Sequence, residues 1–480
     1  MRRSPALLAL FLAVTAVAPA RARAQSVDLA LTDVTLVDVE SGALHPGQTV
    51  LVHGSRITWT GPAARARVPA GARVVDGRGK YVIPGLWDMH VHTSREGRAR
   101  HFWPQFLAHG VTGVREMGSY LDTLRYWRAE ARRPGSVAPR IVFSSPMLDG
   151  DPSSWRHGYG IADAAAARAA VDSMHALGFD FLKVYNRLSR EAYFALAQRA
   201  RERGMVFAGH VPESVALAEA SDAGQRSFEH LDDELFIECV PGGPAALRAF
   251  LDARRSGAPA DSVQARLGRL RAVASAGADA EACRPLMERL ARNGTWITPT
   301  LAVFRGGTAD DALAADPRLR YVPPALAQRW AHDRRPPGDE DGFIEVQRGR
   351  VALMALQAGV GILAGTDASD EAYVFAGSGL HDELALLVGA GFTPLQALQA
   401  ATINPARYLG AADSMGTVAA GRVADLLVLD ADPLEDIRNT LRIHAVVANG
   451  RLIDAARRAR LLALAEREAA ASATAPPARQ

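Results

Sequence analysis

Segments that alternate apolar and polar residues stand at the two ends of the chain. Residues 27–39 and 50–59 alternate in this way, between turns rich in glycine and proline. Residues 412–452 have the same character. Because the termini of a domain often lie close together, we expect residues 25–80 and 412–455 to form one composite β-sandwich domain.

The middle of the chain, residues 81–411, has a different pattern, in which apolar strand-like segments alternate with amphipathic helical ones. The predicted strands are Tyr81–His90, Thr112–Glu116, Arg140–Ser144, Phe181–Tyr185, Met205–His210, Ser227–His230, Trp296–Leu301 and Gly361–Thr366. Helical patterns fall between most of them, including Ala162–Leu177, Arg190–Arg203 and Val215–Ala223. This order predicts an α/β fold, a (β/α)8 TIM-like barrel. The alternative is an open doubly wound sheet, which would favour a glycine-rich phosphate turn after the first strand, and the sequence has none there.

Three segments exceed a minimal barrel: residues 145–160, 232–290 and 303–345. We expect them to be insertions at the active face, where long loops usually have a function or form their own helices. Residues 456–480 are expected to form a terminal helix with a disordered tail.

The N-terminus has the form of an export signal. Arg2 and Arg3 precede the apolar stretch Ala6–Ala18, and Ala22-Arg23-Ala24 is a small-x-small cleavage site. We therefore expect residues 1–24 to be removed and the protein to be periplasmic or extracellular. That segment holds four arginines and no acid, so the formal charge of +3 becomes 3 − 4 = −1.

The mature chain has no basic stripe of the kind that binds nucleic acid. After signal cleavage we expect no association with a membrane. The arginines near Arg457 are interpreted as part of a solvated terminal helix. Cys239 and Cys283 lack the spacing of a zinc or redox motif, and the sequence leaves a disulfide and two free thiols equally open.

The candidate chemistry begins with His90 and His92. Two histidines separated by one residue on a strand point the same way and can hold one divalent metal ion. Further polar residues stand at the carboxyl ends of predicted strands, where a barrel has its active site. They are Lys183, His210, His230 and Asp367, with Glu116 as a weaker candidate.

Zinc accepts imidazole nitrogen and carboxylate oxygen. Four imidazoles and one carboxylate suffice for two metal ions only if another group bridges them. Lys183 can supply that bridge, because a buried lysine loses its proton readily and a neutral amine can add CO₂ to form a carbamate.

With these residues in place, the chain resembles the amidohydrolase superfamily, in particular the branch of imidazolonepropionase, Xaa-Pro dipeptidase and arginine/lysine carboxypeptidase. The resemblance covers about residues 27–455. It includes Pro84-Gly85-Leu86-x-Asp88-x-His90-x-His92, Gly110–Arg115, Lys183, His210, Phe228-Glu229-His230, Gly365-Thr366-Asp367, Asn404-Pro405-Ala406 and Gly421-x-x-Ala424-Asp425-Leu426. Imidazolonepropionase itself is a one-metal enzyme without the bridging lysine, so Lys183 points away from that activity.

The resemblance implies a role for each residue. Two divalent metal ions, expected to be Zn²⁺, would be held by His90, His92 and Asp367 at the buried position and by His210 and His230 at the exposed one. Carboxylated Lys183 and a hydroxide would bridge them. Asp367 would carry the proton to the leaving amine. Tyr185 would donate to the developing oxyanion, with a packed structural tyrosine as the alternative.

These residues predict a secreted metal-dependent hydrolase acting on carbon–nitrogen bonds, with a dipeptide or N-acyl amino acid as its small substrate. A cyclic amide, a lactone or an organophosphate is the alternative on the same metal centre, and a metal-stabilised binding protein without turnover is another. His157 is a weak candidate for substrate contact, and Arg156 and Arg305 are candidates for a substrate carboxylate. Metal identity and side-chain preference stay open, as does a homo-oligomer.

Overall fold

The computed structural model describes residues 27–94, 98–156, 158–231, 233–307, 310–334, 339–368 and 371–472. The predicted signal peptide, residues 1–24, lies outside these ranges, as does most of the predicted disordered tail.

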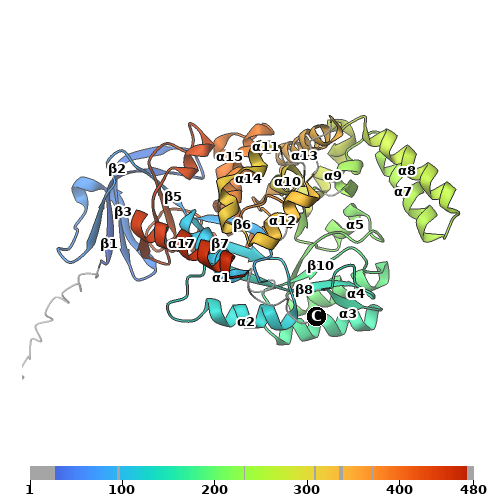
Figure 1. Ribbon diagram of the computed structural model, residues 1–480, viewed down its shortest axis with the longest axis horizontal. Helices are drawn as coiled ribbons and strands as arrows, with labels where there is room; N and C mark the ends of the chain where they lie inside the picture. Colours follow the sequence, from blue (N-terminus) through green and yellow to red (C-terminus); the bar gives the residue numbers. More distant parts are fainter. Residues whose placement is uncertain are drawn as a thin grey trace, which may run out of the picture.

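A sheet built from both chain ends stands at one side of the molecule (Figure 1). Its strands are β1 (Leu29–Val37), β2 (Leu44–His53), β3 (Arg56–Pro62), β4 (Arg73–Asp76), β5 (Tyr81–Pro84), β15 (Leu426–Leu429), β16 (Ile443–Ala448) and β17 (Arg451–Ile453). The order is β17-β16-β15-β5-β1-β2-β3, and β4 pairs with β1. Alternating apolar residues of both ends, such as Leu31, Val50 and Val428, share one buried cluster. The two ends therefore hold each other by apolar contact as well as by strand pairing.

The second sheet lies in the middle of the chain and is parallel. Its strands are β6 (Leu86–Val91), β7 (Val111–Glu116), β8 (Arg140–Gly150), β9 (Tyr159–Ile161), β10 (Phe181–Val184), β11 (Val206–Gly209), β12 (Ser227–Glu229), β13 (Trp296–Thr298) and β14 (Gly361–Ile362). The spatial order β6-β7-β8-β10-β11-β12-β13-β14 follows the chain without the reversal of a doubly wound sheet, and β9 pairs with β8.

The two edges of this sheet are joined by backbone hydrogen bonds. Met89 N donates to Ala364 O at 2.9 Å, and Asp367 N donates to His90 O at 2.7 Å. A parallel bridge links Val91 to Ala368. The segment after β14 thus runs beside β6, so the last candidate residue, Asp367, is brought next to the first, His90.

The predicted strand Tyr81–His90 is divided between the two sheets. β5 ends at Pro84, and β6 begins at Leu86 in the other sheet. Gly85 stands between them, where an added Cβ would lie 2.2 Å from Thr112 Oγ1. Only glycine allows this close approach, which directs β6 from the terminal sheet into the central one.

The helices cover the central sheet and fill the long insertions. They are α1 (Ala99–Ala108), α2 (Leu121–Ala131), α3 (Ala164–Ala176), α4 (Arg190–Arg203), α5 (Leu217–Asp222), α6 (Asp233–Glu238), α7 (Gly243–Arg255), α8 (Ala260–Ala274), α9 (Ala280–Asn293), α10 (Leu301–Gly307), α11 (Asp311–Ala314), α12 (Pro324–Asp333), α13 (Asp339–Gln357), α14 (Ser378–Gly389), α15 (Pro394–Ala400), α16 (Ile403–Tyr408) and α17 (Ala455–Ala471). Short 3₁₀ turns lie at Ala63–Arg65, Pro317–Tyr321 and Ile437–Leu441.

Local signals explain the helix ends. Helix α4 has the predicted bounds because Ser189 caps its first turn, accepting a hydrogen bond from Ala192 N, and Gly204 ends it with a φ of +67°. Helix α3 begins after Asp163, whose carboxylate accepts from Ala166 N. Among the helices of the described residues, none is long and apolar enough to span a membrane.

The segment 145–160, expected to be an insertion, begins instead as strand. Residues 145–150 continue β8 and are buried. The pairing of β8 with β10 is irregular between Phe181, opposite Ser144, and Lys183, opposite Met147. This bulge leaves Pro146 outside the regular ladder of hydrogen bonds. Proline has no backbone N–H to donate, and it is tolerated in this central strand because the bulge requires no hydrogen bond from it.

The other two long segments form helices of their own. Residues 232–290 contain α6, α7, α8 and most of α9, and in Figure 1 the α7–α8 pair extends away from the sheets. Residues 303–345 contain most of α10 and the helices up to the first part of α13.

Helix α17, expected to be solvated, packs against the protein on one face. Leu461, Ala465 and Ala469 are buried. Arg458 donates to Ala108 O at 2.8 Å and to Ile443 O at 2.6 Å. The apolar positions of this helix were thus a better guide to its packing than its arginines were.

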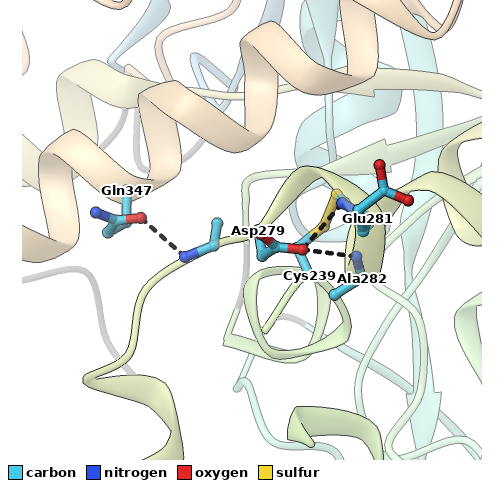
Figure 2. Close-up of a disulfide and its surroundings, with 7 residues drawn as sticks. Cys239, Asp279, Glu281, Ala282 and Gln347 are labelled. Atoms are coloured by element: carbon cyan, nitrogen blue, oxygen red, sulfur yellow. Dashed lines mark hydrogen bonds between the residues drawn. A yellow bond between two sulfur atoms is a disulfide. The ribbon is translucent and has the colours of Figure 1, made fainter. Parts of the chain in front are cut away.

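A disulfide joins Cys239 to Cys283, which settles the alternative that the sequence left open (Figure 2). Asp279 strengthens the same junction: its carboxylate caps α9 through Glu281 N and Ala282 N, and its backbone N donates to Cys239 O at 2.8 Å. Gln347 of α13 accepts from Ala278 N at 2.9 Å. Helices α9 and α13 are thereby tied to the end of α6.

We predict that the double variant Cys239→Ala/Cys283→Ala is less stable by up to about 4 kcal/mol, because the bond closes a loop of 44 residues in the unfolded chain. Urea unfolding measures the difference. Titration of the unfolded, unreduced protein with a thiol reagent is the control, and two free thiols per chain would contradict the disulfide.

Candidate functional site

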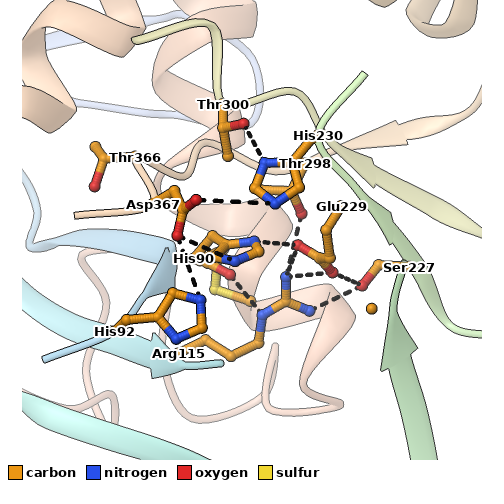
Figure 3. A network of polar contacts seen from close by, with 12 residues as sticks. His90, His92, Arg115, Ser227, Glu229, His230, Thr298, Thr300, Thr366 and Asp367 are labelled. Carbon is orange, nitrogen blue, oxygen red and sulfur yellow. Dashed lines mark hydrogen bonds and ion pairs between the residues drawn. The ribbon is translucent and has the colours of Figure 1, made fainter. Parts of the chain in front are cut away.

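Three imidazoles meet the carboxylate of Asp367 at the carboxyl ends of the central strands (Figure 3). Asp367 Oδ1 lies 3.5 Å from His90 Nε2 and 3.4 Å from His92 Nε2, and Oδ2 lies 3.9 Å from His230 Nε2. Ligand atoms of His90, His230 and Asp367 lie within 4.8 Å of one another. All four residues are buried. Side chains from three separate segments therefore surround one small polar volume.

The outer nitrogen of each of these imidazoles is already engaged. His90 Nδ1 lies 2.8 Å from Glu229 Oε2, His92 Nδ1 donates to Gly118 O at 2.8 Å, and His230 Nδ1 lies 2.7 Å from Thr300 Oγ1. Such partners orient a histidine and leave Nε2 as the ligand atom in metal sites. The three Nε2 atoms are the ones that face Asp367.

A buried ion pair between Arg115 and Glu229 supports His90. Arg115 and Glu229 are wholly buried, and Arg115 Nη2 lies 2.7 Å from Glu229 Oε2. Arg115 also donates from Nε to Met89 O at 2.6 Å and from Nη1 to Tyr408 Oη at 2.7 Å. The guanidinium therefore fixes both the carboxylate that holds His90 and the backbone of β6 next to it.

Asp88 fixes the segment that carries Asp367. Its carboxylate accepts from Thr366 N at 3.0 Å and from Thr366 Oγ1 at 2.6 Å. Burial raises the pKa of Asp88 to about 7, while the hydrogen bonds from Thr366 and from the His90 backbone act in the opposite direction.

Lys183, Tyr185 and His210 form a second group beside the first. The ring of His210 lies 4.9 Å from that of His230 and 4.4 Å from that of Tyr185, between centroids. Lys183 is wholly buried, with Nζ 5.8 Å from the Tyr185 ring centroid. Gly209, with a φ of +136°, precedes His210; an added Cβ there would lie 2.2 Å from Val184 O and 3.0 Å from Lys183 Cδ. Glycine thus permits β11 to approach Lys183 closely.

The surroundings keep the imidazoles of His210 and His230 neutral. The pKa of His230 is lowered to about 3, chiefly by burial and then by the charges of Lys183 and Arg348, while Glu229 acts in the opposite direction. Burial also lowers the pKa of His210 well below its usual value, with Lys183 as the next cause. Neutral imidazoles have a free lone pair, which is the form that binds metal.

Three residues of the site have left-handed backbones without being glycine. The φ angles are +62° at His230, +49° at Thr300 and +56° at Asp367. Such conformations are strained and collect at functional sites. At these three residues the left-handed backbone points the side chain across the carboxyl ends of the strands, whereas a regular strand end would point it elsewhere.

Some predicted candidates have other partners. Glu116 Oε2 accepts from Thr93 N at 2.8 Å and from Ser94 N at 3.0 Å, so it shapes the loop after β6. Arg305 pairs with Asp382 at 3.0 Å. Arg156 is exposed, and His157 lies outside the described residues.

Sequence reasoning missed the roles of Arg115, Glu229 and Arg348. Arg115 and Glu229 stood within the quoted motifs, and a charged residue in a buried strand was the signal that could have singled them out. Arg348 of α13 is 9% exposed, and its guanidinium carbon lies 3.5 Å from the Phe304 ring centroid. It follows the segment 303–345 by three residues, so the expected boundary excluded it.

The donor set fits a metal centre. Oriented imidazoles with a carboxylate are ligands that zinc accepts, and one divalent ion would offset the charge of Asp367 in a buried place. His90, His92 and Asp367 would hold one ion, and His230, His210 and Lys183 lie where ligands to a second would stand.

Comparison with known proteins bears on the family. Residues 337–453, which include Asp367, match the model of the amidohydrolase family. The structure is similar to that of a bottromycin amidohydrolase, with 26% identity, a TM-score of 0.69 and 92% and 90% of the two chains covered. Residues 337–453 therefore carry the sequence features of the amidohydrolase family.

Two further proteins are similar to this chain. An adenine deaminase of Rubrobacter xylanophilus is 26% identical over 436 residues, which are 88% of this chain but 57% of the deaminase. The chain thus spans little more than half the length of that relative. A Xaa-Pro dipeptidase structure with bound methionine shares the fold, with 20% identity, a TM-score of 0.63 and 89% and 99% of the two chains covered. The predicted family is confirmed over residues 337–453, and the similarity to an adenine deaminase and to an amidohydrolase agrees with the predicted enzyme class, a hydrolase acting on carbon–nitrogen bonds.

We predict that Glu229→Gln weakens zinc binding by the protein about 10- to 100-fold, because the amide pairs poorly with both Arg115 and His90 Nδ1. Competition with a chromophoric chelator measures this affinity. Glu202→Gln, which alters an exposed pair with Arg199, is the matched control. Unchanged zinc affinity in Glu229→Gln would show that His90 does not depend on this support.

Proposed function

We propose that this amidohydrolase is an exported enzyme with two metal ions that cleaves the amide bond of a dipeptide or N-acyl amino acid. The observation that carries the proposal is the convergence of three imidazole Nε2 atoms on Asp367, each ring oriented through its other nitrogen. The dipeptidase and amidohydrolase names of the structural neighbours support an amide substrate.

In this proposal His90, His92 and Asp367 would hold one ion, His210 and His230 would hold another, and a carbamate on Lys183 would be a further ligand. Two divalent ions, here Zn²⁺, would supply acidified water and polarise the scissile carbonyl. The carbamate forms when the neutral Nζ of Lys183 bonds to the carbon of CO₂ and a proton leaves. Its negative charge replaces a lysine cation that would lie beside His210 and His230.

Proton movement falls to Asp367. Its carboxylate faces the polar volume, so it can accept a proton from the attacking water and deliver it to the leaving amine as the C–N bond breaks. Tyr185 stacks beside His210, and its hydroxyl pairs with the indole N–H of Trp155. That phenol can donate to the oxyanion as charge develops on the carbonyl oxygen.

Arg348 is our candidate for binding the substrate's free carboxylate. Its charge lies close enough to lower the pKa of His230, and its stacking on Phe304 holds the guanidinium plane in place. Phe304 lies one turn beyond Thr300, the partner of His230. The cation would therefore stand at the outer-metal side of the site.

We also propose the architecture around this site. Residues 81–411 form a closed (β/α)8 barrel, supported by the hydrogen bonds between β6 and the segment after β14. Residues 25–80 and 412–455 form the β-sandwich domain, supported by their shared sheet. Residues 1–24 are removed on export, and the buried disulfide is typical of an oxidising compartment.

The proposal is tested by turnover of zinc-loaded mature protein on dipeptides, N-acyl amino acids, lactones, cyclic amides and phosphotriesters. We expect the first two classes to be cleaved.

Lys183→Ala should lose one of two bound metal ions and nearly all turnover, with partial rescue by added short carboxylates. Tyr185→Phe should keep both ions and lose turnover only. Turnover of only lactones, cyclic amides or phosphotriesters would show that the enzyme cleaves that bond instead of the proposed amide bond. Two bound ions without turnover of any substrate would favour a metal-stabilised binding protein.

We predict that Arg348→Met raises the KM of a cleaved dipeptide about 10- to 100-fold, as expected for loss of one charge-assisted hydrogen bond. The KM of the same dipeptide with an amidated C-terminus should not change. Arg350→Met, an exposed arginine on the same helix, is the control. An equal rise for both substrates would assign Arg348 a structural role instead.

A further inference from the structure

A cavity of about 900 Å³ lies at the end of the central strands opposite the candidate metal site. Its lining includes Arg140, Phe181 and Val206, the first residues of β8, β10 and β11, whereas the metal-site residues follow the strands' carboxyl ends. The loop 132–139 after α2 forms one wall, and Arg451 of β17 and Arg457 of α17 stand on another. Its volume is within the range of pockets that bind small molecules.

The lining carries a strong excess of positive charge. Among its described residues, seven are arginines and two are aspartates, whereas the whole chain has 55 basic and 52 acidic residues. Arg140 pairs with Asp425, and Arg133 with Glu130. Arg132, Arg451 and Arg457 have no carboxylate partner among the described residues. Three guanidinium groups around one hollow favour an anion there.

The remaining walls are apolar. Trp87, Phe143, Phe181, Leu409 and Met415 line the cavity. A fully hydrated inorganic anion would gain little from these surfaces, whereas an anion with an apolar body would bury that body against them. The two kinds of wall together select an amphipathic anion.

The inner end of the cavity is linked to the metal site by hydrogen bonds. Tyr408 and Arg115 are among the lining residues. Tyr408 Oη lies 2.7 Å from Arg115 Nη1, Arg115 Nη2 lies 2.7 Å from Glu229 Oε2, and that oxygen lies 2.8 Å from His90 Nδ1. A molecule that displaces the Tyr408 ring would therefore alter the support of His90.

We propose that this cavity binds a small amphipathic anion, a carboxylate or phosphate on an apolar body, and that its occupancy changes the metal affinity of His90 through Tyr408, Arg115 and Glu229. The binding step is independent of the hydrolase activity proposed above, and the coupling requires only that the site holds metal.

Calorimetric titration of the metal-free mature protein tests the binding step, with octanoate and octyl phosphate as probes and octylammonium as the matched cation. We expect saturable binding of at least one anion, no binding of octylammonium, and at least tenfold weaker anion binding in Arg451→Ala/Arg457→Ala. The control Arg442→Ala/Arg460→Ala removes two exposed arginines outside the lining and should leave binding unchanged. Absence of anion binding, equal binding of octylammonium, or equal loss in both double variants would overturn the site.

Zinc affinity with and without the saturating anion tests the coupling. We expect a change of at least about fivefold, and reciprocity requires the same change in anion affinity when zinc is bound. Tyr408→Phe keeps the ring but removes the hydroxyl that reaches Arg115, so the anion should still bind without altering zinc affinity. An equal zinc effect in Tyr408→Phe, or none in the unaltered protein, would refute the coupling and leave the binding result intact.

Discussion

The candidate metal site depends on one buried ion pair, Arg115 with Glu229. Both side chains are wholly buried. Burying two charges costs free energy of desolvation, and this cost is offset only when every hydrogen-bond donor and acceptor has a partner. Arg115 meets that condition with contacts to Glu229, Met89 O, Ser227, Thr298 and Tyr408. The pair adds little to stability compared with apolar residues of the same size. The pair instead orients His90, because Glu229 presents a fixed carboxylate to His90 Nδ1 and so points His90 Nε2 at Asp367.

The same principle extends around the rim. Gly118, Thr300 and Asp88 act on His92, His230 and the Asp367 segment as Glu229 acts on His90. Left-handed backbones at His230, Thr300 and Asp367 complete the arrangement. Rigid partners beneath a set of ligands reduce the reorganisation needed when a charged group binds. The opposite end of the strands is different, because there Arg132, Arg451 and Arg457 line a hollow and have no carboxylate partner among the described residues.

Much of this arrangement follows from local sequence patterns. The alternation of side chains on a strand places His90 and His92 on one face, and the carboxyl ends of parallel strands gather residues as distant as His90 and Asp367. The caps Ser189 and Gly204 define α4 without tertiary information. The division of the strand at Gly85 and the extension of β8 past Pro146 depend on neighbours far along the chain, Thr112 and Lys183. Arg348 reaches the site through the course of α10 and α13, which no short motif encodes. The roles proposed for the site residues stay predictions; these are His90, His92, Lys183, Tyr185, His210, His230 and Asp367.

We propose that side chains from separate strands hold two metal ions with a modified Lys183 between them. Anomalous diffraction at the zinc edge from crystals of the zinc-loaded protein is the decisive test. We expect two peaks, one among His90, His92 and Asp367 and one beside His210 and His230, with density continuing beyond Lys183 Nζ toward both. A single peak, or an unmodified Lys183 whose amine points away from both positions, would contradict it.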